Sequence, residues 1–385
     1  MTALPDRRAW LGPLLLVLAT AIVAACDPSQ GGAPGFGQSG QPLRPAEPTD
    51  PFNLLAWLFT PVFQGLFLIL VAVYAALKAA AVPGAIGISI IVLTLVVRTI
   101  LIPLYRRQLV SQRRMQMLQP EIAEIKRRFK GDAMKQRLAQ QELLKERGVN
   151  PLAGCLPLLL QLPLLFIIYS VIANGLTSYD PTPMLTVGGV QVVPLECPSE
   201  PPAPGTTDPC IDTIVPLLGD VSVPEVIIGE AGGFLTGLSL MAVIASILQL
   251  VQSRMMLMPP DPTNDDPNVR IQRQMMLFLP LISILYGSLL PAGLFIYWIV
   301  ATLFSIVQQY LIVGWGAMFP LFGFTPGFAK DYTPRFPVAM PPPRDPSTRP
   351  SKSVLGGADV SRAAAADKTI RHRERGRQGR RGRRR

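Results

Sequence analysis

A single arginine interrupts a long apolar run in this chain. Residues 84–105 read GAIGISIIVLTLVVRTILIPLY, and about 20 such residues can cross a bilayer as a helix. Arg98 is the only charge in the run, and Thr94 lies one turn before it on the same face. No acidic residue lies in this run or in the other apolar runs, so Arg98 has no ion-pair partner within them. The pattern favours an arginine that faces a hydrated space inside a helical bundle, and the alternative is a side chain that snorkels to the membrane surface.

Further polar side chains lie within other apolar runs. Residues 294–313 carry a stripe spaced at i, i+4, i+7 and i+11, and residues 151–174 contain one strongly polar side chain in their apolar part. The stripe lies on one face of a helix, where it commonly serves hydrogen bonding between helices. Together with an unpaired arginine, it indicates a hydrophilic groove. The candidate groove residues are Arg98, Thr94, Gln161, Trp298, Thr302, Ser305 and Gln309.

Residues suited to covalent or metal chemistry are scarce in the sequence. The only histidine is His372, close to the C-terminal end, and the four cysteines show no zinc-type pair spacing. We find no Gly-rich phosphate loop and no pairing of a nucleophile with a base. We therefore expect no enzymatic activity, no metal and no cofactor.

Composition and charge distribution predict a membrane protein with several spans. The chain has 385 residues, of which 49% are hydrophobic and 16% charged, with a net charge of +11. Residues 106–147 contain twelve Lys or Arg, which places them in the cytoplasm by the positive-inside rule. Residues 175–233 contain eight Asp or Glu and no Lys or Arg, so we expect them on the outer side.

The N-terminus has the pattern of a lipoprotein signal peptide over residues 1–26. Arg7 and Arg8 form a positive region, an apolar stretch follows, and small residues precede Cys26. Lipidation of Cys26 would anchor it to the outer face of a bacterial plasma membrane. The alternatives are an ordinary signal peptide or an uncleaved anchor.

The expected fold is an all-α polytopic membrane protein with five transmembrane helices around a groove. An odd number of spans must separate an outer Cys26 from the cytoplasmic basic segment. Because residues 84–105 are the stronger candidate for that single span, we interpret residues 52–83 as an interfacial helix that does not cross the membrane. The basic segment predicts a helical hairpin with its turn at Gly131-Asp132. The expected order after the signal peptide is a tether (27–51), the interfacial helix (52–83), a first span (84–105), the hairpin (106–150), a second span (151–174), an outer loop (175–233), a third span (234–253), a cytoplasmic loop (254–273), a fourth span (274–290), a fifth span (291–314) and a tail (315–385).

Two cysteines lie close together in the expected outer loop. Cys197 and Cys210 are in a compartment that permits a disulfide, but their spacing leaves open whether one forms. Cys155, in the second expected span, is more typical of a small buried apolar side chain.

The tail, residues 315–385, is first Pro-rich and then Arg-rich. Such a composition cannot bury a core, so we expect disorder. Its arginines would neutralise phosphates of RNA, including a ribosome, or of anionic lipid. The candidate contact residues are Arg371, Arg373, Arg375, Arg377, Arg380, Arg381, Arg383, Arg384 and Arg385.

Several stretches together resemble the YidC/Oxa/Alb family of membrane-protein insertases. They are LTLVVRTILIPLYRRQ, RRMQMLQPEI, VNPLAGCLPLLLQLP and LPAGLFIYWIVATLFSIVQQYLI, in the family's order and spacing. The resemblance covers about residues 52–314 except the outer loop. The lipoprotein signal and the five expected spans are similar to the Gram-positive-type members, and the large periplasmic domain of proteobacterial members is absent. The outer loop and the apolar stretch 52–80 are both longer than the family pattern.

The resemblance implies five helices around a hydrophilic groove that opens to the cytosol and to lipid and is closed on the outer side. Arg98 matches the family's groove arginine, and Gln161 and Trp298 match polar or aromatic groove positions. The hairpin matches a region that receives substrates, and the basic tail matches ribosome-binding tails.

The expected function is insertion and folding of membrane proteins without covalent chemistry, alone or with the Sec translocase. Expected partners are nascent membrane proteins, membrane lipid and, through the tail, the ribosome. Two alternatives remain. One is a transporter that binds an anionic solute at Arg98, although we find no repeated halves. The other is a membrane anchor for ribosomes or RNA, which leaves Arg98 unexplained.

Overall fold

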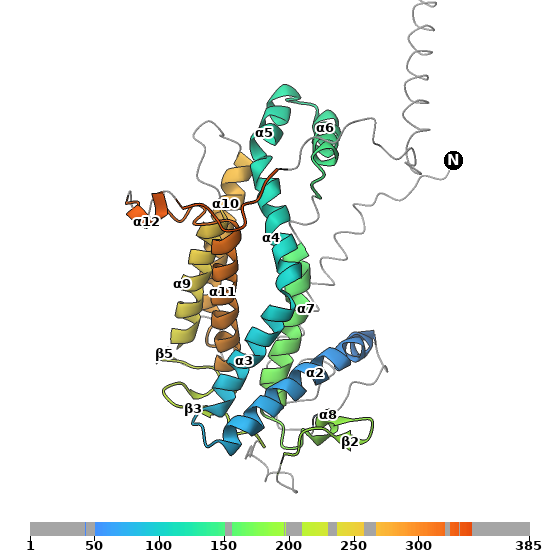
Figure 1. Ribbon diagram of the computed structural model, residues 1–385, viewed down its shortest axis with the longest axis vertical. Coiled ribbons are helices and arrows are strands. Elements are labelled where there is room, and N and C mark those ends of the chain that lie inside the picture. The colour runs from blue at the N-terminus through green and yellow to red at the C-terminus, as the bar shows by residue number, and fades with distance from the viewer. Residues whose placement is uncertain are drawn as a thin grey trace, which may run out of the picture.

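The computed structural model describes residue 43 and residues 51–150, 156–195, 197, 210–229, 237–257, 267–319, 324–330 and 332–340. Within these residues the fold is mostly helical (Figure 1). The predicted signal peptide with Cys26, most of the predicted tether, Cys155 and the Arg-rich end of the tail lie outside them. The longer helices are α2 (Pro51–Ala79), α3 (Ala85–Ile100), α4 (Ile102–Met117), α5 (Gln119–Arg128), α6 (Ala133–Glu146), α7 (Leu156–Ser170), α9 (Leu240–Met256), α10 (Pro267–Leu285) and α11 (Ala292–Ile312).

Two described helices are long and apolar enough to cross a membrane, namely α2 over Trp57–Ala79 and α11 over Ala292–Ile312. The bent pair α3–α4 makes a third if it is counted as one span. The apolar helices Pro163–Gly175, Leu240–Met256 and Arg273–Leu285 are shorter. The expected interfacial helix therefore has the length and composition of a span, although Figure 1 shows α2 running obliquely past the lower ends of α3 and α7.

The predicted first span, 84–105, is not one straight helix. It breaks at Leu101, where α3 and α4 meet at an angle of 63°. Pro103 explains the break, because proline has no N–H to donate to Thr99 and its ring collides with that carbonyl. The bend directs α4 away from α3 toward the basic hairpin (Figure 1).

The predicted basic hairpin is formed by α5 and α6, which follow α4. The turn contains Gly131, with φ of 92°, and Asp132, which caps α6 by accepting a hydrogen bond from the Lys135 backbone N–H at 3.1 Å. Arg147 closes the hairpin with two hydrogen bonds to the Glu121 carboxylate, at 3.0 and 3.1 Å. The turn at Gly131-Asp132 agrees with the sequence pattern.

The helices pack in two contiguous groups around α11. On one side α11 packs against α3, and α3 packs against α2, which also contacts α7. On the other side α11 packs against α9, and α9 packs against α10. Buried aromatic and aliphatic side chains join α2, α3, α7 and α11, and they include Phe63, Phe67, Tyr74, Ile90, Ile168 and Tyr297. The helices are close enough that Gly175 has no room for a side chain, since a Cβ there would lie 2.7 Å from the Phe67 ring.

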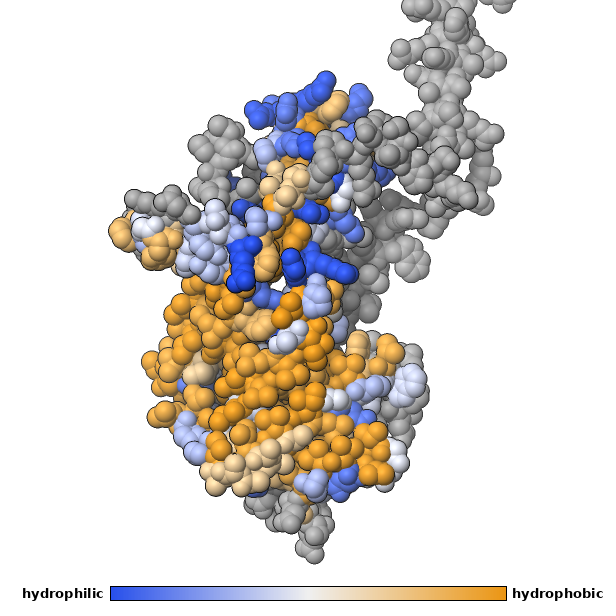
Figure 2. Space-filling view, viewed as in Figure 1, coloured by the Kyte–Doolittle hydropathy of each residue, from blue (hydrophilic) through white to orange (hydrophobic). Residues whose placement is uncertain are grey.

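A broad apolar belt is formed by exposed side chains of several helices. It includes side chains of α3, α9, α10 and α11, and Figure 2 shows a continuous hydrophobic surface below the basic helices on the face in view. Exposed apolar side chains on several helices of a bundle are typical of helices that face lipid. Members of the belt are Leu95, Ile247, Phe278, Leu279, Leu303 and Val307.

The expected outer loop is folded, and it contains strands that the sequence analysis did not predict. The described part of this loop, together with the first residues of the predicted third span (234–253), forms α8 (Thr182–Leu185) and three two-stranded antiparallel ribbons. A disulfide joins Cys197 and Cys210, whose Cα atoms are 4.9 Å apart. The ribbons pair β1 (Thr186–Val187) with β2 (Val190–Gln191), β3 (Ile214–Val215) with β4 (Gly219–Asp220), and β5 (Ile228–Gly229) with β6 (Gly237–Leu238).

The same loop caps one end of the bundle. The carbonyls of Val221 and Val223 accept hydrogen bonds from the backbone N–H groups of Gly293 and Ala292, at 2.8 and 2.9 Å. These N–H groups belong to the first turn of α11 and have no partner within the helix. The buried Leu43 also docks here, with its N–H donating to the Asp180 carbonyl at 3.0 Å.

The prediction of disorder from residue 315 onward is wrong for the described part of the tail. Residues 332–340, here called the strap, lie against α4 and α11, and a short helix, α12 (Gly327–Lys330), precedes them. Tyr332 stacks on Tyr310 with ring centres 4.5 Å apart, and the Phe336 N–H donates to the Leu311 carbonyl at 3.0 Å. Ring stacking and backbone hydrogen bonds with α11 hold this segment in place.

Candidate functional site

Arg98 lies in the last turn of α3 and is only 7% exposed. Its Nη1 donates to the Ser305 hydroxyl of α11 at 3.2 Å, and its guanidinium lies over the Tyr105 ring, 4.7 Å from the ring centre. Its Nε has no hydrogen-bond partner among the described residues. A buried cation is thus held by neutral groups.

A chain of polar contacts continues from this arginine across four helices. The Tyr105 hydroxyl, on α4, donates to Gln161 Oε1 on α7 at 3.3 Å. Gln161 Nε2 donates to the Tyr297 hydroxyl of α11 at 3.4 Å, and Tyr297 also interacts electrostatically with Arg98. The polar cluster, defined as Arg98, Tyr105, Gln161, Tyr297 and Ser305, therefore joins α3, α4, α7 and α11.

The helix break explains how Tyr105 reaches Arg98. In a straight helix, residues seven positions apart are separated by about 10.5 Å along the axis. The 63° bend after α3 shortens this path and turns the Tyr105 ring over the guanidinium. On α11 the Ser305 hydroxyl donates to the Ala301 carbonyl at 2.9 Å, which leaves its oxygen lone pairs free to accept from Arg98.

Ion pairing does not neutralise the cluster within the described part of the chain. The described ion pairs, Lys135–Asp132 and Arg147–Glu121, both lie in the basic hairpin. No carboxylate of the described residues lies within 4.0 Å of Arg98. The positive charge at the centre of the bundle is thus uncompensated by these residues, and it can attract a carboxylate from another molecule.

The other predicted groove residues have different surroundings. Thr94 is buried and donates to the Ile90 carbonyl of its own helix at 2.6 Å. Thr302 and Gln309 are also buried, and the Gln309 Oε1 accepts no hydrogen bond from the described residues. Trp298 is not in the polar cluster.

Trp298 packs instead on the far side of α11. Its ring stacks with those of Phe295 and Tyr286, at 6.1 and 6.3 Å between centres, next to Ala242 and Ala245 of α9. The neighbouring Tyr297 reaches the cluster in its place. The sequence pattern could have identified Tyr297, because Tyr297, Ala301 and Ser305 are spaced at i, i+4 and i+8 and therefore share a face of the helix.

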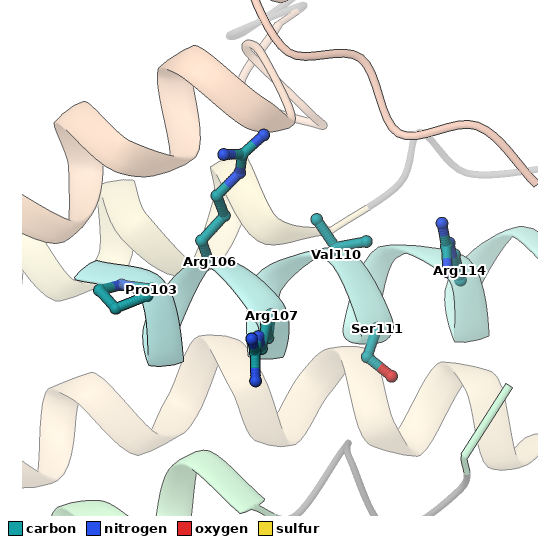
Figure 3. A pocket seen from close by; sticks show the side chains of 6 residues that line it. All are labelled: Pro103, Arg106, Arg107, Val110, Ser111 and Arg114. Carbon is teal, nitrogen blue, oxygen red and sulfur yellow. The ribbon is translucent and has the colours of Figure 1, made fainter. Parts of the chain in front are cut away.

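A cavity of about 490 Å³ lies beside α4, next to residues 103–114 and largely C-terminal to Tyr105. The residues that line it are spaced at i, i+3, i+4, i+7, i+8 and i+11, so they share one face of the helix. Figure 3 shows that three of the six are arginines. They are Pro103, Arg106, Arg107, Val110, Ser111 and Arg114.

An apolar helical bundle with a buried polar cluster defines an integral membrane protein, and comparison with known proteins gives its family. The model of the 60Kd inner membrane protein family matches residues 77–316, which include the helices from α3 to α11. The chain belongs to this family, and its bacterial relatives and apolar helices indicate a protein of the bacterial inner membrane.

Named relatives agree with this family. The chain is 33% identical over 230 residues to the membrane protein insertase YidC of Methylobacterium radiotolerans, covering 60% of this chain and 32% of that protein. It is 32% identical over 232 residues to the insertase of Methylorubrum extorquens, covering 60% and 33%. It is 30% identical over 261 residues to that of Shewanella pealeana, covering 68% and 37%. The chain thus spans about a third of the length of these relatives.

Proposed function

We propose that this chain inserts and folds membrane proteins through the space next to the polar cluster. The observation that carries the proposal is Arg98, a buried cation held by Ser305 and Tyr105 without a carboxylate among the described residues. A protein that needed Arg98 only for packing would gain by pairing or removing the charge. The relatives named as membrane protein insertases support the same function.

The mechanism is electrostatic and needs no covalent step. A carboxylate costs about 2.5–3.5 kcal/mol at the centre of a membrane on insertion scales. Attraction to a cation at 4 Å is worth about 4 kcal/mol at an effective dielectric constant of 20. The two magnitudes are similar, so Arg98 can offset most of the cost of bringing one acidic residue into the bilayer. The substrate helix then moves sideways into lipid, where its apolar surface is favoured.

The proposed topology has residues 106–150 in the cytoplasm and 175–233 outside. The five spans correspond to α3 with its bend, α7, α9, α10 and α11, and α2 lies at the outer interface. The contact of Leu43 with Asp180 supports a common side for the tether and the loop. Cys26 is then lipidated on the outer face, as in a Gram-positive-type lipoprotein.

Accessibility labelling tests this topology with two single-cysteine variants. Val190→Cys, on the exposed β2 strand, should react with an impermeant reagent from outside, and Lys135→Cys, on the exposed α6, should react only after the cell is opened. The opposite pattern would exclude the topology and the insertase mechanism with it.

The proposed partners are nascent membrane proteins, lipid, the ribosome through the Arg-rich tail, and the Sec translocase for some substrates. A tail that contacts ribosomal RNA loses affinity steeply as salt rises, because counterion release drives its binding. Removing residues 368–385 should therefore abolish salt-sensitive co-sedimentation with ribosomes. Co-sedimentation that is equal in the truncated and full-length chains would exclude this role.

Photo-crosslinking during translation tests the function directly. A photoreactive residue at Ser305 faces the polar cluster, whereas one at Leu303, two positions away on α11, faces the apolar belt. The Ser305 probe should crosslink to a nascent membrane protein while its first span is being inserted, and the Leu303 probe should crosslink mainly to lipid. Equal crosslinking from both positions would contradict a substrate path beside Arg98.

A further inference from the structure

The cavity beside α4 concentrates positive charge without a compensating negative charge on the helix. Residues 102–117 contain four arginines and no Asp or Glu. Three of these arginines, Arg106, Arg107 and Arg114, line the cavity. None of them forms one of the ion pairs in the described part of the chain. The face therefore offers guanidinium donors to an anion.

The strap fixes two of these arginines in place. The Arg106 guanidinium lies 5.1 Å from the centre of the Phe336 ring, and Arg114 Nε donates to the Ala339 carbonyl at 3.2 Å. Neither contact uses all the N–H donors of its arginine, since each guanidinium has five. The strap thus reduces the entropy that these side chains would lose when they bind an anion.

Arg107 is the free member of the set. Figure 3 shows the Arg106 and Arg107 side chains extending in different directions from the face of α4 that lines the cavity, so they flank the cavity. Arg107 has no hydrogen bond or ion pair among the described residues. Its guanidinium is available for a bidentate contact with phosphate oxygens.

The charged face begins where the apolar surface ends. Ile100 and Ile102 are 67% and 38% exposed, and Ile102 lies one turn before Arg106 on α4. Figure 2 shows hydrophilic (blue) atoms directly above the edge of the hydrophobic surface. An apolar strip that leads into a group of arginines matches the form of a phospholipid, with its acyl chain below and its phosphate above.

We propose that this face of α4 is a binding site for one anionic phospholipid of the cytoplasmic leaflet. The phosphate contacts Arg107 together with Arg106, and an acyl chain lies along Ile102 and Ile100. The cavity, at about 490 Å³, is large enough for a lipid headgroup. The site is distinct from the polar cluster, and it anchors the start of the basic hairpin at the membrane surface whether or not the chain acts as an insertase.

Calorimetry on the full-length chain in uncharged detergent tests the proposal. The probes are dioctanoyl phosphatidylglycerol, dioctanoyl phosphatidylcholine with the same acyl chains, and inorganic phosphate. Phosphatidylglycerol should bind saturably, and phosphatidylcholine and inorganic phosphate should not bind at the same concentrations. Equal binding of the two lipids, or of free phosphate and phosphatidylglycerol, would overturn the proposal.

Arg107→Gln is the test variant, because this side chain has no described contact whose loss would disturb the fold. The charge-matched control is Arg127→Gln on the exposed end of α5. Loss of a charge-assisted hydrogen bond should weaken phosphatidylglycerol binding by about tenfold or more in Arg107→Gln. Arg107→Lys should retain part of the affinity, and the control should retain all of it. Equal weakening in test and control would show that Arg107 does not bind the lipid, and displacement of the lipid by a short RNA at lower concentration would contradict a site specific for phospholipid.

Discussion

The Arg98 guanidinium lies 4.7 Å from the centre of the Tyr105 ring, although a helix break separates the two residues. A desolvated cation–π contact of this kind is worth about 2 kcal/mol or more. It stabilises the cation without neutralising it, since an aromatic ring carries no net charge. Arg98 therefore keeps its attraction for an incoming carboxylate, and the ring takes part of the role that water has at an exposed arginine.

The two functions of Tyr105 can be separated by substitution. Tyr105→Phe keeps the ring over Arg98 and loses only the hydrogen bond to Gln161, so insertion should remain close to that of the unmodified protein. Tyr105→Leu loses both, and insertion of a substrate with an acidic translocated segment should fall severalfold. The measurement is insertion in a depletion strain, normalised to the abundance of each variant. Equal activity of the two variants would show that the ring does not support Arg98.

Gly175 and Gly65 form a matched pair for testing helix packing. A Cβ at Gly175 would lie 2.7 Å from the Phe67 ring, whereas a Cβ at Gly65 would meet nothing within 4 Å. Gly175→Ala should destabilise the protein by about 1–3 kcal/mol through overpacking. Gly65→Ala should be neutral or stabilising, because alanine favours helices. Thermal unfolding midpoints of both variants in one detergent decide the comparison, and an equal shift for the two would contradict the close packing of α2 against Val171–Gly175, the π-helical segment that follows α7.

The cap of α6 should depend on pH. Hydrogen bonding to Lys135 holds the pKa of Asp132 below its ordinary value of 3.8. A carboxyl with a lowered folded pKa stabilises the fold above its unfolded pKa and stops doing so as the pH falls through the folded pKa. Amide hydrogen exchange in residues 133–146 should therefore rise below about pH 3.8 relative to the rest of the chain. Asp132→Asn keeps a capping oxygen and should remove this pH dependence. A dependence that persists in the variant must come from another group.

Much of the helical architecture follows from apolar runs and charge blocks. The sequence predicts the ends of α11 and the turn at Gly131-Asp132 within a few residues, because hydropathy and turn chemistry are local properties, whereas α9 begins six residues after the predicted start at 234. The ribbons of the outer loop were missed because each has only two residues per strand and depends on contacts with distant segments, such as the pairing of Val221 with Gly293. The order of the strap was missed because composition does not reveal which aromatic residues find partners.

The residues of the polar cluster could also be predicted only in part from the sequence. Arg98, Gln161 and Ser305 were identified because each is polar within an apolar run. Tyr105 and Tyr297 were not, because tyrosine is common at membrane surfaces and its hydroxyl does not stand out by hydropathy. Trp298 belongs to the same predicted stripe as Ser305, but its ring packs against Phe295 and Tyr286 and not against the cluster. The bend at Pro103, which brings Tyr105 to Arg98, could have been inferred from the proline itself.

The role of Arg98 leads to a direct comparison of two substrates that differ only in charge. One carries acidic residues in its translocated segment, and in the other these are replaced by their neutral amides. Arg98→Lys should retain much of the insertion of both, because it keeps the charge. Arg98→Ala should lose the acidic substrate and lose little of the neutral one, because the neutral segment does not need the cation.

The decisive measurement is insertion of these two substrates by Arg98→Ala in a depletion strain, with the abundance of the variant quantified in parallel. The account predicts a defect confined to the acidic substrate at nearly unchanged abundance, since removing a buried charge relieves its desolvation cost. An arginine that serves only the structure predicts otherwise, because its loss would strand Ser305 and its other polar neighbours and destabilise the protein. Equal defects for both substrates that follow a fall in abundance would contradict the electrostatic role of Arg98.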